Sequence, residues 1–367
     1  MDFNAMRKLF PVTENYIFLN NAAESPLNLK VRSKIDEYLD LVLNAPQTKP
    51  SVRYQVRQLL SDLLGGRADE YALMTSTGMG VSIVAAGYNW NKGDNVVVPS
   101  NEHWNNSFPW KALKRKGVDV RFVPLNENNR ILPEAVAALT DKNTKVVAVA
   151  AVSFSTGFRS DLKKISEIAH NNGAIFIVDG IQGAGAVPIN VETDCIDVLC
   201  CAGFKWLLGM PGTGFLYVNK NIQELINPML PGMFAADLYS KELQYYPDAR
   251  RYETGSIAYS LFHGWSAGLE LLKEIGIENI YERILLLTDR IISGLQEKNI
   301  KIITPVEAIT ERSGIILFTL GSEQANKVIY EKLLKRNIIV TLRDGVIRVS
   351  PSFYNTEEEI DTFLNTL

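Results

Sequence analysis

The sequence predicts an α/β protein with a large domain built on a mostly parallel sheet and a smaller α+β domain at the C-terminus. Short apolar runs rich in Val and Ile are bounded by turn residues, as is typical of strands buried on both faces. Helical stretches lie between these runs, which is the pattern of repeated βαβ units. The 367 residues, 46% of them apolar, are enough for a large core and a second domain.

The predicted elements of the large domain follow in chain order. An amphipathic helix is expected over residues 28–45. In residues 160–173, Ser160 can cap the start of a helix and Gly173 can end it. The expected buried strands are "DNVVVPS", "DVRFVPL", "TKVVAVAAVS", "GAIFIVDG" and "IDVLCCAG".

After about residue 275 the pattern changes to a layer of helices and strands that predicts a separate small domain. The three expected parts are residues 1–20, an N-terminal segment packing with the small domain, residues 21–275 and residues 276–367. Within the last part we expect a helix over about 278–297, strands in "IKIITP", "GIILFTL", "IIVTL" and "GVIRVSPSF", and helices in "EQANKVIYEKLLKRN" and "TEEEIDTFLNT".

Composition excludes several function classes. The net charge is -3, with 38 basic and 41 acidic residues, so the chain has no excess of positive charge for nucleic acid or an anionic membrane surface. It shows no apolar stretch of spanning length and no signal peptide, and we expect a cytoplasmic protein. The three cysteines, Cys195, Cys200 and Cys201, have no metal-ligand spacing and are expected in the core.

One lysine stands in unusual surroundings. In "DCIDVLCCAGFKWLLGMPGTGFLYVNK", Lys205 lies between Phe204 and Trp206 after a buried strand. Apolar surroundings disfavour the ammonium form, lower the pKa and make the amine a nucleophile that can form a Schiff base with an aldehyde. Asp179 ends the preceding strand, so both groups are expected at the same edge of the sheet.

An aldehyde that suits this pair is pyridoxal phosphate, because its ring nitrogen needs a carboxylate opposite, and Asp179 fits that position. The phosphate needs donors. The stretch "LMTSTGMGVSIVAAG" offers hydroxyls and glycines that open a helix, which is a natural anion site.

From about residue 15 to the C-terminus the chain resembles the class V aminotransferase family, the fold-type I pyridoxal-phosphate enzymes that include cysteine desulfurases, selenocysteine lyases and isopenicillin-epimerase-like proteins. The resemblance implies a seven-stranded sheet in the large domain and pyridoxal 5'-phosphate as cofactor. The matching stretches occur in the family's order: "YIFLNNAAESPL", "TSTGMGVS", "NEHWNNSFPW", "VSFSTGFRSDL", "FIVDGIQGAGAVPINV", "AGFKWLLGMPGTGFLYV", "YETGS" and "RVSPSFYNTEEEID".

The resemblance implies roles for the residues that would hold the cofactor. Lys205 is expected to be the Schiff-base lysine, and Asp179 the partner of the pyridine nitrogen. Gln182 is expected to donate a hydrogen bond to the ring hydroxyl, and Thr77 and Gly78 to cradle the phosphate.

It also implies the groups on the substrate side. His103 matches the imidazole that stacks on the cofactor ring and moves protons. Arg348 matches the arginine that holds the substrate α-carboxylate, and Asn21 is expected at the substrate too. Ser256 stands where the family has a threonine that reaches the phosphate of the other subunit, so a homodimer is expected.

Three positions and one segment depart from cysteine desulfurases. Ala202 and Phe204 replace a serine and a histidine that bind phosphate, and Phe154 replaces an asparagine beside the ring oxygen. The segment "NIIVTLRDGVIRVS" has no cysteine, so sulfur transfer through a persulfide on the protein is disfavoured.

The resemblance therefore implies an enzyme that acts on an amino acid through an external aldimine and a quinonoid, as an aminotransferase or as a desulfurase-like C–S lyase without a persulfide cysteine. His103 favours the lyase, because ordinary aminotransferases of the family tend to have an aromatic residue there. The alternatives are an amino-acid epimerase and a non-catalytic protein of this fold. A dinucleotide site in "GIQGAGAVP" is disfavoured, since the third glycine is missing.

Overall fold

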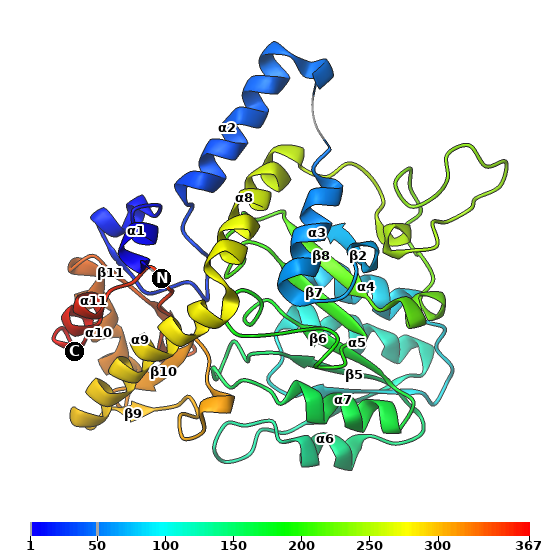
Figure 1. The fold of residues 1–367 in the computed structure, drawn as a ribbon. Helices are drawn as coiled ribbons and strands as arrows, with labels where there is room; N and C mark the ends of the chain where they lie inside the picture. Colours follow the sequence, from blue (N-terminus) through cyan, green and yellow to red (C-terminus); the bar gives the residue numbers. More distant parts are fainter. Residues whose placement is uncertain (1, 49–50) are drawn as a thin grey trace.

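The computed structural model describes residues 2–48 and 51–367 and has a seven-stranded sheet at the centre of its large domain (Figure 1). The strands lie in the order β2-β8-β7-β6-β5-β3-β4. Only β8 runs antiparallel to its neighbours, so the sheet is mostly parallel, as predicted. The strands are β2 (Tyr71–Met74), β3 (Asn95–Pro99), β4 (Asp119–Val123), β5 (Thr144–Ala150), β6 (Ile175–Asp179), β7 (Val198–Ala202) and β8 (Gly214–Val218).

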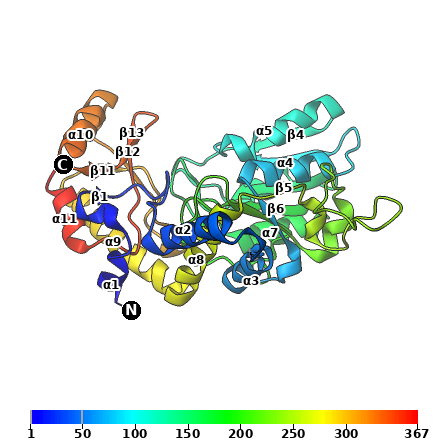
Figure 2. The same cartoon turned by 90° about the horizontal axis from the view of Figure 1, so that it is seen from above.

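Helices cover both faces of this sheet, and Figure 2 shows α4 and α5 on one face and α3, α7 and α8 on the other. The long helix α2 projects from the body beside α8 (Figure 1). The helices of this part are α2 (Leu29–Asn44), α3 (Arg53–Leu64), α4 (Thr77–Gly87), α5 (Phe108–Lys111), α6 (Pro133–Leu139), α7 (Leu162–Asn171) and α8 (Tyr259–Ile275).

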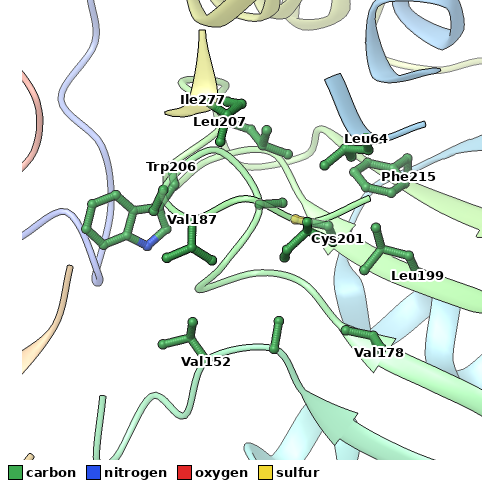
Figure 3. Packing of buried hydrophobic residues seen from close by; sticks show 14 of the residues in the cluster. Leu64, Val152, Val178, Val187, Leu199, Cys201, Trp206, Leu207, Phe215 and Ile277 are labelled. Atoms are coloured by element: carbon green, nitrogen blue, oxygen red, sulfur yellow. The ribbon is translucent and has the colours of Figure 1, made fainter. Parts of the chain in front are cut away.

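Side-chain alternation along the strands explains why two helical layers are needed. In β7, Leu199 and Cys201 belong to the core cluster on the α3 and α7 face, whereas Val198 and Cys200 belong to the cluster under α4 and α5. Successive residues of a strand point to opposite faces, so an unbroken apolar strand must be covered on both. Figure 3 shows Cys201 among apolar side chains that include Leu199 and Phe215.

The small domain has a four-stranded sheet in the order β12-β13-β10-β9. The N-terminal segment joins it, because β1 pairs in parallel with β11. The elements of this part are α1 (Phe3–Arg7), β1 (Ile17–Phe18), α9 (Ile277–Glu297), β9 (Lys301–Ile302), β10 (Ile316–Thr319), α10 (Glu323–Lys335), β11 (Ile338–Ile339), β12 (Thr341–Arg343), β13 (Val346–Val349) and α11 (Glu357–Leu364). In residues 2–48 and 51–367 we find no helix that is long and apolar enough to cross a membrane.

Three local expectations were wrong. Asp161, not Ser160, caps α7 by accepting from the Lys164 N–H, because the Ser160 hydroxyl donates to the Ala150 carbonyl instead. Cys195 is exposed rather than in the core, since it lies in the turn before β7 with a left-handed φ of 51°. The run "IIVTL" forms two short strands, β11 and β12, that pair in different sheets.

Candidate active site

A cavity lies at the carboxyl ends of β5 and β6, where parallel strands are expected to collect ligands. About 350 Å³ of empty space, open solvent included, lies in and in front of it. Its lining joins groups from several parts of the large domain: Thr77, Glu102, His103, Asn105, Ala150, Val152, Phe154, Asp179, Ile181, Gln182 and Lys205.

Lys205 follows β7 and reaches this cavity, as the sequence predicts. Burial, and next the nearby charge of Arg348, lower the pKa of its amine to about 8, although the Asp179 carboxylate acts in the opposite direction. A lysine with this pKa has an appreciable fraction of free amine near neutral pH, which is the form that attacks carbonyl carbon and accepts protons.

Asp179 is the last residue of β6 and is buried in the cavity wall. Its Oδ1 accepts a hydrogen bond of 2.9 Å from the Ile181 N–H, and Oδ2 has no hydrogen-bond partner within the described part of the chain. Burial raises its pKa to about 6, against the Ile181 hydrogen bond and the Lys205 charge, which lower it. A cationic ring nitrogen placed here would supply the missing partner and favour the carboxylate.

Gln182 holds the wall beside Asp179 through both ends of its amide. Its Oε1 accepts from the Trp206 indole N–H at 3.0 Å, and its Nε2 donates to the Ala22 carbonyl at 2.9 Å. The amide nitrogen has two donors, so one N–H is left for a ligand. The structure therefore fixes Gln182 in orientation and still permits the donor role that the resemblance implies.

The start of α4 forms the end of the cavity where a phosphate is expected. Ser76 caps the helix, and the backbone N–H groups of Thr77 and Gly78 have no acceptor in the part of the chain that the structure describes. The Thr77 hydroxyl accepts from the Ala202 N–H at 3.0 Å and still has its own proton to donate. A helix N-terminus with free N–H groups suits an anion, which partly compensates for the lost side-chain donors at Ala202 and Phe204.

These groups fit pyridoxal phosphate. One cavity brings together a lysine with a lowered pKa, a buried carboxylate with one unpaired oxygen, an amide donor and a site for an anion.

His103 lines the cavity from the segment that leads into the 3-10 helix Trp104–Asn106. Its Nδ1 accepts from the Asn105 N–H at 3.2 Å, so a neutral ring carries its proton on Nε2. Burial, then Lys205 and Arg343, lower its pKa, which keeps the ring neutral near pH 7. The ring packs edge-on against Phe154 at 5.2 Å between centroids, so Phe154 supports the orientation of His103.

Arg348 lies on β13 of the small domain, and its guanidinium reaches the segment that carries Phe154. It donates to the Phe154 carbonyl at 3.4 Å, and its Nε has no partner among the described residues. Burial, and next Arg343, lower its pKa to about 10. A buried guanidinium without a carboxylate partner is suited to bind one from a ligand.

Four predicted site residues are not part of the cavity lining. Gly78 and Arg348 contact residues that are, Asn105 and Phe154. Asn21 and Ser256 are the other two. Asn21 is buried, but its amide donates to the Ser350 carbonyl and accepts from the Tyr354 hydroxyl, so it ties the N-terminal segment to the small domain. Ser256 is exposed on the segment before α8. A substrate role for Asn21 and a role for Ser256 at another subunit stay predictions.

The cysteines lie away from the cavity. Cys200 and Cys201 are buried in β7, where burial raises the pKa of both thiols. Cys195 precedes the amino end of β7, whereas Lys205 follows its carboxyl end. Among the described residues, the cavity lining contains no cysteine.

The sequence reasoning missed Glu102 and Asn105. Glu102 is half-buried, with its Oε2 enclosed. It accepts from the Ala150 N–H at 2.5 Å, and its pKa is raised to about 8, first by burial of the carboxylate and then by the Asp179 charge. Asn105 packs over Gly78, where an added Cβ would lie 3.0 Å from its side chain. Both flank His103 in "NEHWNN", and an acidic residue beside a candidate catalytic histidine was the available signal.

Comparisons with known proteins agree with this geometry. Residues 17–363 match the family model described as Aminotransferase class-V. A probable cysteine desulfurase of Methanothermobacter thermautotrophicus is 28% identical, over 99% of this chain and 96% of that protein. The uncharacterized aminotransferase YcbU of Bacillus subtilis is 28% identical, over 96% of this chain and 94% of that protein.

Solved structures are similar over almost the whole chain. The apo structure of a cysteine desulfurase from Thermococcus onnurineus matches with a TM-score of 0.89 and 25% identity, covering 98% of this chain and 96% of that one. The cystine C–S lyase C-DES, in complex with cysteine persulfide, has the same fold with a TM-score of 0.89 and 24% identity, covering 97% and 98% of the two chains.

Proposed function

Because this chain belongs to the class-V aminotransferase family, we propose that it is a pyridoxal-phosphate-dependent enzyme that cleaves a carbon–sulfur bond in an amino acid. The family and fold type expected from the ordered motifs are confirmed. The observation that carries the proposal is the pair formed by Lys205 and Asp179, which line one cavity from the ends of adjacent strands.

The chain's own groups account for binding of the cofactor. When bound, pyridoxal phosphate supplies an aldehyde that takes up amino groups and a ring that accepts the electron pair released at the substrate α-carbon. Lys205 is its covalent anchor, and Asp179 keeps the ring nitrogen protonated. Gln182 orients the ring, while the N–H groups of Thr77 and Gly78 bind the phosphate.

The same groups then act on the amino acid. Arg348 binds the α-carboxylate, which positions the α-carbon hydrogen toward Lys205. Lys205 can act as a base only once the substrate's amino group has replaced it on the aldehyde. Its free amine, with a pKa of about 8, then removes that proton near neutral pH. His103 stays neutral and carries a proton on Nε2, so it can donate this proton to the sulfur that leaves the substrate.

In the part of the chain that the structure describes, no thiol lines the cavity, which distinguishes this site from one that stores sulfur on the protein. Cys195 lies at the opposite edge of the sheet, and the other two thiols are buried with raised pKa values. Two relatives are named cysteine desulfurases, and we assign to this chain the C–S cleavage without the persulfide step. Transamination is the second candidate, since one relative is named an aminotransferase.

The test uses purified holoenzyme. Borohydride should fix the cofactor to Lys205, as read by peptide mass spectrometry. A panel of amino acids then separates the reactions: pyruvate and a sulfur product without added keto acid indicate the lyase. A keto acid formed only with a second keto acid indicates the aminotransferase, and inversion alone indicates an epimerase. An unmodified Lys205 in cofactor-saturated protein contradicts the whole proposal.

A homodimer is part of the proposal, with Ser256 reaching the partner's phosphate. Large apolar side chains are exposed on the projecting end of α2 and on the segment after residue 228, which also projects from the body (Figure 1). They are Leu39, Val42, Leu43, Met229, Leu230, Met233, Leu238, Tyr239 and Leu243. Light scattering should give twice the chain mass, and Leu43→Glu should lower that mass and cofactor affinity together.

A further inference from the structure

The hairpin β12–β13 places two arginines on one face of the small-domain sheet. Thr341 pairs with Arg348, and Arg343 pairs with Val346. Paired residues of antiparallel strands share a face, and residues two apart on one strand do too. Arg343 and Arg348 therefore project to the same side, and both act on the charge of Lys205.

Phe154 connects this pair to the cavity. Arg348 donates to the Phe154 carbonyl at 3.4 Å, and the Arg343 guanidinium lies 4.5 Å from the centroid of the Phe154 ring. Arg343 also lies 5.6 Å from the ring centroid of Trp104, next to His103. Because Phe154 lines the cavity, Arg343 stands at the substrate side of the site rather than on a remote surface.

Neither guanidinium has a strong carboxylate partner. Arg348 makes no ion pair among the described residues, and Arg343 has one contact of 3.4 Å, to the exposed Asp344. Elsewhere the chain pairs its buried arginines closely, as where Arg53 and Arg57 share the Glu253 carboxylate. Two adjacent cations left without such a partner repel each other, and the repulsion contributes to the lowered pKa of Arg348.

An ordinary amino acid uses one of these cations. Its α-carboxylate occupies Arg348 under the proposed function, on which this inference rests. Arg343 then remains, stacked on an aromatic face that leaves its in-plane N–H groups free to bind an oxyanion.

We propose that Arg343 binds a second anionic group at the far end of the substrate, so that the preferred substrate is an amino acid with two acidic ends. The second group is a carboxylate or a similar planar or tetrahedral oxyanion. This assigns substrate preference to the β12–β13 hairpin and reaction chemistry to the large-domain sheet.

Inhibitor binding to the holoenzyme tests the assignment without turnover. Succinate carries two carboxylates and butyrate one, and both have four carbons. The wild-type protein should bind succinate at least about 10-fold more tightly than butyrate, by thermal shift and by competition, because succinate forms a second charge-assisted pair. Arg343→Gln should abolish this preference and leave butyrate binding unchanged.

Arg336→Gln is the matched control, since it removes the same charge from the small domain away from the cavity, and it should keep the succinate preference. The proposal is overturned if the wild-type protein binds the two inhibitors equally well. It is also overturned if Arg343→Gln binds neither inhibitor. A succinate preference in a protein that transforms no amino acid would instead contradict the proposed function alone. KM for acidic amino acids should rise in Arg343→Gln, with KM for neutral ones unchanged.

Discussion

The two sides of the cavity are built differently. On the sheet side, Asp179, Gln182 and Thr77 each form a hydrogen bond with the backbone of the surrounding fold. On the hairpin side, Arg343 and Arg348 make one contact with an exposed aspartate and one long hydrogen bond to a carbonyl. Under the proposed function, the sheet side holds the groups for the cofactor in place before any ligand arrives, whereas the hairpin side keeps its cations available for the substrate.

This contrast has a physical basis in the fold. The sheet-side groups follow parallel strands buried on both faces, so they cannot move without disturbing a large core. The hairpin strands are only three and four residues long and turn through Asp344 and Gly345. We therefore expect changes on the sheet side to affect the reaction itself, and changes on the hairpin to affect which substrate binds.

The strongest test of the sheet side is Lys205→Ala. It removes the covalent anchor and the base together, so activity should fall by about 10⁴-fold or more, and borohydride should fix no cofactor to the protein. Product formation and peptide mass spectrometry measure the two effects. Lys220→Ala, an exposed lysine after β8, is the matched control and should keep both. If Lys205→Ala kept its activity, the expectation that the sheet side carries the reaction and the hairpin side only the choice of substrate would be wrong.

A smaller loss is expected for Asp179→Asn. The amide has nearly the same shape but no charge to stabilise a protonated ring nitrogen, so kcat should fall by roughly 10²–10³-fold, while KM changes little. Steady-state kinetics separates the two constants. Asp161→Asn keeps a helix cap and should be neutral. A rise in KM with kcat unchanged would place Asp179 among the substrate-binding groups instead.

Glu102 gives the sheet side a pH dependence. Its pKa rises from 4.5 to about 8 on folding, so between these values the folded state holds a proton that the unfolded state has released. Stability contributed by this proton is complete below pH 4.5 and is lost as pH rises through about 8. Glu102→Gln mimics the protonated form at every pH. The difference in Tm, variant minus wild type, should therefore be about 2–4 °C larger at pH 8 than at pH 5.

Thermal unfolding of cofactor-free protein at several pH values measures this difference. Asp179 adds a slope of the same sign between pH 3.8 and about 6 in both proteins, so it cancels. Glu134→Gln is the control. Glu70→Gln is less suitable, because Glu70 is itself buried and hydrogen-bonded. A constant difference in Tm across the pH range would show that Glu102 is ionised throughout.

Much of the sheet side could be predicted from sequence. Apolar runs identify strands buried on both faces, and the carboxyl ends of parallel strands meet at one edge, so the proximity of Asp179 and Lys205 follows from the pattern. The resemblance supplied the order of the motifs and the domain type. Glu102 was missed because burial of one carboxylate beside another is a tertiary property that no local pattern records.

The hairpin side was harder to predict. Arg348 was identified only through the resemblance, and Arg343 not at all, because nothing in "TLRDGVIRV" distinguishes an arginine that contacts the cavity wall from a surface one. The strand register and the position of Phe154 decide that question. For Asn21 the motif predicts a contact with the substrate, and the structure adds that its amide bonds to Ser350 and Tyr354.

The smallest effect is expected at the hairpin turn. Gly345 has φ of 76°, a left-handed conformation that costs an alanine about 1 kcal/mol, and an added Cβ would meet only ordinary contacts with Glu323. Gly345→Ala should therefore lower stability slightly and misplace the two arginines, which raises substrate KM a few-fold without changing cofactor affinity. Gly321→Ala is the control, because Gly321 also has a left-handed φ, of 95°, and an added Cβ would meet nothing within 4 Å. Kinetics and cofactor titration distinguish the outcomes: a loss of cofactor affinity in Gly345→Ala would show that the hairpin supports the sheet side as well, and the two sides would then be a single unit.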